Sequence, residues 1–354
     1  MTNAEALILL VRTLSKNEKR SFRLGKKSTA DYIVLFDLID KDELITVDGL
    51  KEAFENKGKG AVFNVTVTYL YKLLLDKLLA LRQNQDSDYS LMTQILKAKI
   101  LFEKSIFPAA LEILEKVKHD AAALEKNEAL IMASRLELDY LHYLNMPDIS
   151  EEDLINRHYS LNTALSNLGN LYEQSALYEL LTHRIIFKGS VRTSSQKTSL
   201  NDLVFTEQNL VRKASTSFEA QKHHLLFQSA FLMAVGDEQS ASDVLMQLNR
   251  LITEYPAIGN PLFYLAIIEN MLENLRETRR YDQIPVFIER LAAISHPSQM
   301  VMMHIGALAG LYRLLLLLDR GEFHKAKEFI DRSEVLQPSS IEKLNPVLES
   351  KISL

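Results

Sequence analysis

The stretch from Gly321 to Pro338, GEFHKAKEFIDRSEVLQP, decides the fold. Its glycine precedes a helical pattern that opens with Phe323 and Ala326 and continues with Ile330 one turn later. A small residue such as Ala326 allows two antiparallel helices to approach closely, and larger apolar residues fill the seam to the next pair. The stretch therefore predicts the second helix of a helical hairpin, with its turn at the glycine.

Three other stretches repeat this rhythm. Ser105–Val117 is a close copy, Arg280–Pro297 is a weaker one, and Gly236–Pro256 is degenerate. Long amphipathic runs separated by short polar turns fill the intervening sequence, and no run of useful length alternates with a period of two. The chain after residue 84 is therefore expected to be all-α.

In order and spacing, these stretches resemble the second helices of tetratricopeptide repeats. Val244, Ile284 and Ala326 occupy equivalent positions and lie 40 and 42 residues apart, whereas the standard repeat has about 34 residues. The resemblance implies a right-handed α-α superhelix, a tetratricopeptide-like solenoid of stacked hairpins. It also implies a concave surface, lined by the first helix of each pair, that binds an extended peptide or a partner helix.

The opening of the chain carries a second similarity. Leu14–Phe22, LSKNEKRSF, and Tyr69–Leu74, YLYKLL, are similar to an uncharacterised family of bacterial helical-repeat proteins. This similarity implies no activity, but it indicates that residues 1–84 form an integral N-terminal helical module. The apolar-free segment Gln83–Asp88 marks the boundary to the repeat region, residues 85–354.

Within the N-terminal module the pattern predicts five helices. Ser15 and Glu18 have the spacing of a capping box, in which each side chain satisfies an exposed backbone N–H, so a helix is expected to begin there. Of the other four helices, one ends near Thr13, and three cover Tyr32–Asp40, Thr46–Phe54 and Phe63–Arg82.

Composition excludes several classes of protein. Among 354 residues there are only 11 glycines and 8 prolines, which is low for an all-β chain with its many turns. The absence of cysteine rules out disulfides, cysteine-ligated metals and thiol nucleophiles, and it fits a reducing compartment. The apolar runs Ala6–Val11 and Ile305–Leu318 are shorter than a signal peptide or membrane span needs, so a cytoplasmic protein is expected.

Two surfaces are expected to bind a partner. The apolar stripe of Leu308, Leu311, Leu315 and Leu318 would face the groove in the last repeat. Either another helix, from Ser340–Leu354 or from a second subunit, covers this stripe, or the stripe is open for binding. The second surface is a charged row in the preceding repeat. Either a charged peptide binds this row, or the row is an ordinary solvent-facing surface. Its members are Glu269, Glu273, Arg276 and Arg280.

A basic segment supplies the alternative function. Residues 12 to 27 carry a net charge of +6, and clustered cations of this kind suit a phosphate backbone. These cations would lie beside a helix-turn-helix formed by Thr46–Phe54 and Phe63–Arg82 and would contact DNA. The protein would then be a transcriptional regulator whose helical repeats form a sensor domain. The opening Val65–Thr68 is poorly suited to reading bases, and a solvated helix face is the simpler explanation of the charge. The candidate nucleic-acid-binding residues are Lys16, Lys19, Arg20, Arg23, Lys26 and Lys27.

The sequence shows no motif for catalysis, metal binding or a cofactor. Phosphate-binding, dinucleotide-binding, zinc-protease and hydrolase motifs are absent. The adjacent His223 and His224 would point about 100° apart on a helix, which does not suit one metal ion. The expected function is therefore a non-catalytic scaffold or adaptor that needs no cofactor and binds a protein or peptide, with self-association left open.

Overall fold

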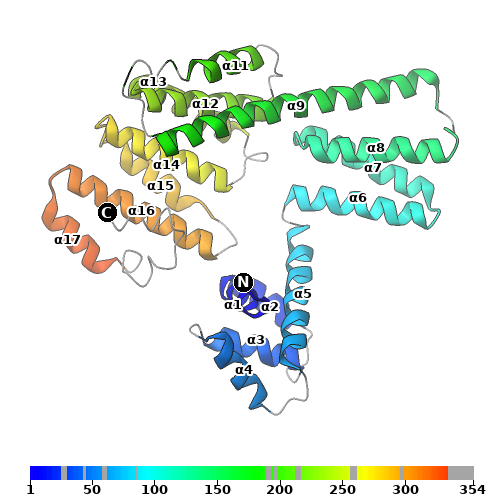
Figure 1. The fold of residues 1–354 in the computed structure, drawn as a ribbon, viewed down its shortest axis with the longest axis horizontal. Helices are drawn as coiled ribbons and strands as arrows, with labels where there is room; N and C mark the ends of the chain where they lie inside the picture. Colours follow the sequence, from blue (N-terminus) through cyan, green and yellow to red (C-terminus); the bar gives the residue numbers. More distant parts are fainter. Residues whose placement is uncertain are drawn as a thin grey trace. The chain divides into compact units, whose positions relative to one another are not determined.

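The computed structural model describes residues 1–24, 30–42, 45–57, 62–84, 86–147, 149–188, 193, 198, 200–211, 217–255, 261–295 and 299–333; for 261–263 and 299–300 only the backbone is described. This part of the chain forms sixteen α-helices and contains no strand (Figure 1). The expectation of an all-α protein is confirmed for these residues.

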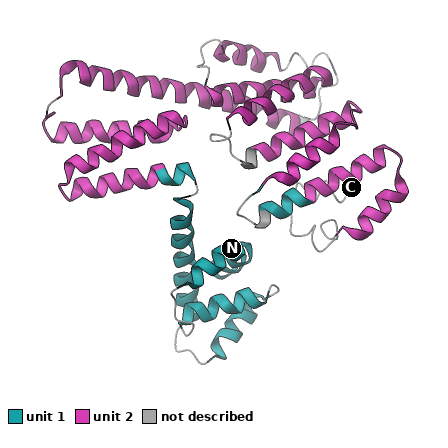
Figure 2. Cartoon of the chain, turned by 180° about the vertical axis from the view of Figure 1, so that it is seen from behind, with its two compact units in different colours: residues 1–90, 295–306, 338–354 teal, residues 91–294, 307–337 magenta. Residues whose placement is uncertain are grey.

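The helices divide into two compact units (Figure 2). Among the described residues, unit 1 contains 1–90 and 295–306, and unit 2 contains 91–294 and 307–333. The first division thus falls after Ser90, close to the polar segment that marks the boundary in the sequence.

Unit 1 begins with five helices that correspond to the five segments expected from the sequence. Ser15 caps the second of them, because its hydroxyl accepts the Glu18 N–H at 3.3 Å while its own N–H donates to the Glu18 carboxylate at 2.8 Å. A second capping box, between Thr2 and Glu5, begins the first helix. The bounds are α1 Asn3–Thr13, α2 Lys16–Arg23, α3 Asp31–Lys41, α4 Val47–Glu55 and α5 Phe63–Arg82.

The core of unit 1 is built from large apolar side chains on all five of these helices. The rings of Phe22 and Phe36 lie 4.8 Å apart, which fixes α2 against α3. The β-branched opening of α5 is helical throughout, with Val67 buried and Val65 exposed. Other fully buried members of the core are Leu7, Leu35, Leu50, Phe54, Leu70 and Leu74.

The remaining helices lie mostly in unit 2, although α6 and α16 begin in residues grouped with unit 1. Most helices from α7 to α15 pack on their neighbours in the chain: α7 on α8, α8 on α9, α9 on α12, and so on to α15, with α11 against α9 and α12. The bounds are α6 Ser87–Glu103, α7 Phe107–Ala123, α8 Asn127–Tyr143, α9 Glu151–Lys188, α11 Asn201–Val211, α12 Phe218–Val235, α13 Glu238–Glu254, α14 Pro261–Glu277, α15 Ile284–Ala293, α16 Gln299–Asp319 and α17 Phe323–Arg332.

One turn geometry recurs six times between these helices. At the α16–α17 turn Gly321 has φ +73°, its N–H donates to the Leu318 carbonyl at 2.9 Å, and the Glu322 N–H donates to the Leu317 carbonyl at 2.8 Å. This is the Schellman arrangement, which satisfies carbonyls left free at a helix end. The residues that hold the same left-handed position and the same pair of bonds in the other five turns are Ser105, Glu125, Asn145, Gly236 and Arg279.

The recurrent turn predicts opposite effects for two substitutions. Arg279→Gly should raise the free energy of unfolding by about 0.5–1 kcal/mol, because glycine adopts a positive φ without strain. Gly321→Ala should lower it by about 1 kcal/mol for the same reason. Denaturant titrations of both variants test this. Equal signs for the two changes would contradict the role assigned to the turn.

Glu125, in the α7–α8 turn, also caps a distant helix. Its carboxylate accepts the backbone N–H groups of Phe218 at 3.0 Å and of Glu219 at 3.2 Å, the first two residues of α12. A carboxylate at a helix N-terminus satisfies free donors and interacts favourably with the helix dipole. The α7–α8 turn is thereby fixed to a helix that begins 93 residues later.

Candidate functional site

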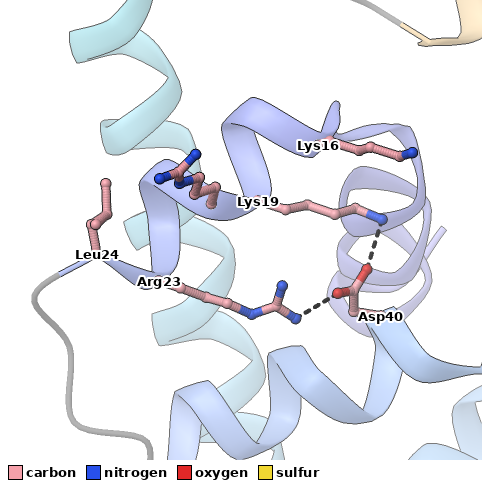
Figure 3. A pocket seen from close by; sticks show the side chains of 6 residues that line it. Lys16, Lys19, Arg23, Leu24 and Asp40 are labelled. Atoms are coloured by element: carbon pink, nitrogen blue, oxygen red, sulfur yellow. Dashed lines mark hydrogen bonds and ion pairs between the residues drawn. The ribbon is translucent and has the colours of Figure 1, made fainter.

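The basic side chains of α2 line an open depression of about 660 Å³ on unit 1, together with Leu24 and Asp40 (Figure 3). Both Lys19 and Arg23 point toward Asp40, which lies on α3 (Figure 3). Their side-chain nitrogens lie 2.7 Å and 2.5 Å from the Asp40 carboxylate, and Arg23 also contacts the Asp37 carboxylate at 2.9 Å. These ion pairs hold α2 against α3. Two of the expected nucleic-acid-binding cations are therefore used within unit 1 itself.

The electrostatics of this cluster follow from those ion pairs. Burial raises the pKa of Asp40, but hydrogen bonds and charge from Lys19 and Arg23 outweigh it, so the net pKa is lowered. Lys16 and Arg20 are exposed and form no ion pair within the described part of the chain. The depression thus offers two unpaired cations to an anion. The other two expected residues, Lys26 and Lys27, lie outside the described residues.

The lowered pKa of Asp40 predicts a pH-dependent stability. A carboxyl whose folded-state pKa lies below its unfolded value contributes stability above the unfolded value, about 3.9, and that contribution is lost as the pH falls through the folded-state pKa. Asp40→Asn should therefore lower the free energy of unfolding by about 1 kcal/mol at pH 7, a modest value because solvent screens the pair. The difference from wild type should shrink below pH 4. A difference that stays constant down to pH 2 would contradict the assignment.

The leucine stripe expected on α16 is divided between core and surface. Leu308 and Leu311 are buried in unit 2, Leu315 is half-buried, and Leu318 is 40% exposed. Of the two interpretations left open by the sequence, burial applies to the first two leucines. Ser340–Leu354, which the sequence offered as a cover, lies outside the described residues.

The charged row on α14 and in the turn after it makes contacts to neighbouring helices. Arg276 donates to the Asp319 carboxylate at the end of α16 at 2.6 Å, and Arg280 donates to the Ser242 hydroxyl of α13 at 2.7 Å. The backbone carbonyl of Glu269 accepts from the Tyr312 hydroxyl at 3.5 Å. Burial, followed by the charges of Glu273 and Glu269, raises the pKa of Tyr312. The row thus joins α13, α14 and α16 through its own side chains.

An exposed apolar stripe that the sequence did not single out lies on α6. Its three residues are spaced four apart, so they share one face of the helix. The exposed residues are Met92, Leu96 and Ile100, at 37, 59 and 55%, whereas Leu91, Ile95 and Ala98 are buried in the core with α7 and α8. The signal in the sequence is that α6 is apolar on two faces.

An aromatic cluster holds α6 in place. The Phe102 ring of α6 stacks on the Tyr140 ring of α8, with centroids 3.5 Å apart and planes 4° apart. Phe107 and Tyr143 contact Phe102 from two further directions, at 4.9 Å and 5.4 Å. Because Phe102 contacts aromatic rings of both α7 and α8, and Leu91, Ile95 and Ala98 are buried in the same core, α6 is packed within its own unit.

The two adjacent histidines face different carboxylates. His224 contacts Glu207 of α11 at 2.5 Å, and His223 lies 3.8 Å from Glu219. Burial lowers the pKa of His223. Among the described residues no group of three or more histidine, cysteine, aspartate or glutamate side chains could hold a metal ion. The expectations of no enzyme activity and no cofactor stay predictions.

By length and composition alone, one described helical stretch, Val301–Asp319, could cross a membrane. Less than half of that stretch is buried, and core helices of soluble proteins meet the same criteria. No protein-family model, no curated protein and no solved structure matches the chain.

Proposed function

We propose that this chain is a non-catalytic protein-interaction scaffold, in which α6–α17 form a tetratricopeptide-like solenoid that binds a helical or extended segment of a partner protein. The recurrent Schellman turn supports the repeat architecture, and so does the packing of successive helices. Side-chain contacts between helices add a third argument. Four hydrogen bonds between two side chains join residues 36 to 43 positions apart, close to the repeat spacings in the sequence: Asn274–Glu238, Arg280–Ser242, Arg290–Asn249 and Arg276–Asp319.

The exposed stripe of α6 is the observation that carries the proposal of partner binding. Three large apolar side chains at positions i, i+4 and i+8 are the pattern that pairs with an amphipathic helix. Leaving such a row in water is unfavourable, by roughly 25 cal/mol for each Å² of apolar surface that a partner would cover. Because the aromatic cluster already fixes α6, binding a partner would require little ordering of this chain.

Affinity recovery tests the proposed function. Tagged full-length protein is incubated with native cytoplasm, and the recovered protein is identified, purified and tested again by titration. We expect wild type and Val286→Glu, a change at an exposed apolar residue of α15, to bind this partner. Leu96→Glu should lose it while keeping the wild-type helical circular dichroism. Failure of every purified candidate to bind the wild type would contradict the proposal.

The two unpaired cations of α2 favour a second candidate function, a regulator whose N-terminal module contacts DNA. Neutralising two phosphates predicts a slope of about −2 when the logarithm of the binding constant is plotted against the logarithm of salt concentration. Lys16→Glu combined with Arg20→Glu should remove that dependence. Fluorescence anisotropy with a labelled duplex at low salt makes the measurement, and an absence of binding by wild type would dismiss this candidate.

A further inference from the structure

The charges beside the exposed stripe of α6 carry an inference about the partner. Three exposed lysines, Lys97, Lys99 and Lys104, accompany the stripe, with Glu103 as the one acidic residue between positions 91 and 104. None of the three lysines forms an ion pair within the described part of the chain. The stripe is therefore flanked by a net positive charge that the protein itself leaves unpaired.

Helix geometry places these lysines on both sides of the stripe. At about 100° per residue, Lys99 lies roughly 60° to one side of Leu96, and Glu103 lies about 20° to that same side. Lys104 follows the last residue of α6 and continues the opposite side at roughly 80°. Lys97 lies on the same side as Lys104, about 100° from Leu96. The stripe from Met92 to Ile100 spans about 12 Å along the axis, which corresponds to two turns of a partner helix. An apolar centre with charged flanks on both sides is the layout of a helix-pairing face.

We infer that α6 binds an amphipathic helix whose apolar face is flanked by acidic residues, above all on the side that meets Lys97 and Lys104. This inference rests on the proposed function and names the chemistry of its partner. A second copy of this chain is disfavoured as the occupant, because pairing two α6 faces would bring together two sets of unpaired lysines, and like charges across an interface oppose binding. Acidic flanks would instead pair with Lys97, Lys99 and Lys104, and they would select partners as well as stabilise the complex.

Two synthetic peptides test the inference. Both carry leucines at the same i, i+3, i+4 and i+7 positions, and their flanking residues are all Glu in one and all Lys in the other. We expect full-length wild type to bind the Glu-flanked peptide about tenfold or more tightly than the Lys-flanked one at low salt, with the preference narrowing as salt rises. Leu96→Glu should abolish binding of both peptides, whereas Val286→Glu should leave binding unchanged.

A charge reversal provides the decisive variant. Lys97→Glu, Lys99→Glu and Lys104→Glu together should invert the preference toward the Lys-flanked peptide. The matched control reverses three exposed lysines of unit 1, Lys51, Lys72 and Lys77, which changes the net charge of the chain equally. This control should retain the wild-type preference. Circular dichroism confirms that each variant is folded.

The possible failures are distinguishable. Equal binding of the two peptides by wild type would overturn the acidic-partner inference and leave the scaffold proposal standing on the apolar stripe. A partner from the cytoplasm that still binds both Leu96→Glu and the triple α6 variant would also overturn the inference, and the scaffold proposal would then have to rest on a surface other than the α6 stripe. Binding of neither peptide by wild type would also overturn the inference, and the scaffold proposal would then depend on affinity recovery alone.

Discussion

Glu137→Ala is expected to lower the free energy of unfolding of unit 2 by about 3–5 kcal/mol, because it removes the buried carboxylate that two partly buried cations share. Glu137, on α8, is buried, and its carboxylate contacts Lys118 of α7 at 2.7 Å and Arg157 of α9. Three successive helices thus meet at one side chain. Denaturant unfolding, followed by circular dichroism, measures the loss.

A compensated variant separates the charge effect from a packing effect. Replacing all three groups together, by Glu137→Leu, Lys118→Met and Arg157→Met, should recover most of the stability, since apolar residues of similar volume often replace a buried ionic group without loss. If the triple variant is as unstable as Glu137→Ala, the loss arises from packing and not from unpaired charge. Lys118 also contacts Glu115 at 2.6 Å, so some of its charge stays compensated in the single variant.

Leu311→Glu should destabilise unit 2 by about 4 kcal/mol or more, because it places a carboxylate without a partner in the core. Leu318→Glu, two turns later on α16, should change stability by less than about 1 kcal/mol, since that side chain is 40% exposed and a carboxylate there can reach water. Thermal unfolding of the two variants side by side makes the comparison. Similar losses for both would show that the whole stripe belongs to the core, and no loss in either would show that it is a free surface.

Local signals in the sequence predicted the helices of unit 1 closely. The capping box of Ser15 and the 3.6-residue periodicity from Phe63 to Arg82 each involve residues that are close together in the sequence. They can therefore be recognised without knowledge of the tertiary structure. The left-handed turns were harder. Gly236 and Gly321 stand out in the sequence, but Ser105 and Arg279 take the same conformation without the residue that favours it.

The binding surfaces could not be predicted in the same way. Leu308 and Leu318 have the same chemistry and a similar place in the helical pattern, and only the packing of neighbouring helices separates the buried one from the exposed one. The charged row shows the same limit, because the partners of Arg276 and Arg280 lie 43 and 38 residues away. The α6 stripe was missed because its two apolar faces cancel in any measure of amphipathicity.

Glu125 has a consequence for how the chain folds. In repeat proteins each unit gains stability from its nearest neighbours, so unfolding can proceed piecewise from one end. The carboxylate of Glu125 caps α12 across 93 residues, so α12 gains its full N-terminal cap only after the α7–α8 turn has formed. Bringing these two residues together closes a long loop, which lowers the entropy of the chain, and contacts formed later must compensate for this loss. The cap therefore couples early and late helices of unit 2 into one cooperative transition and makes its assembly slower than that of a chain with purely local contacts.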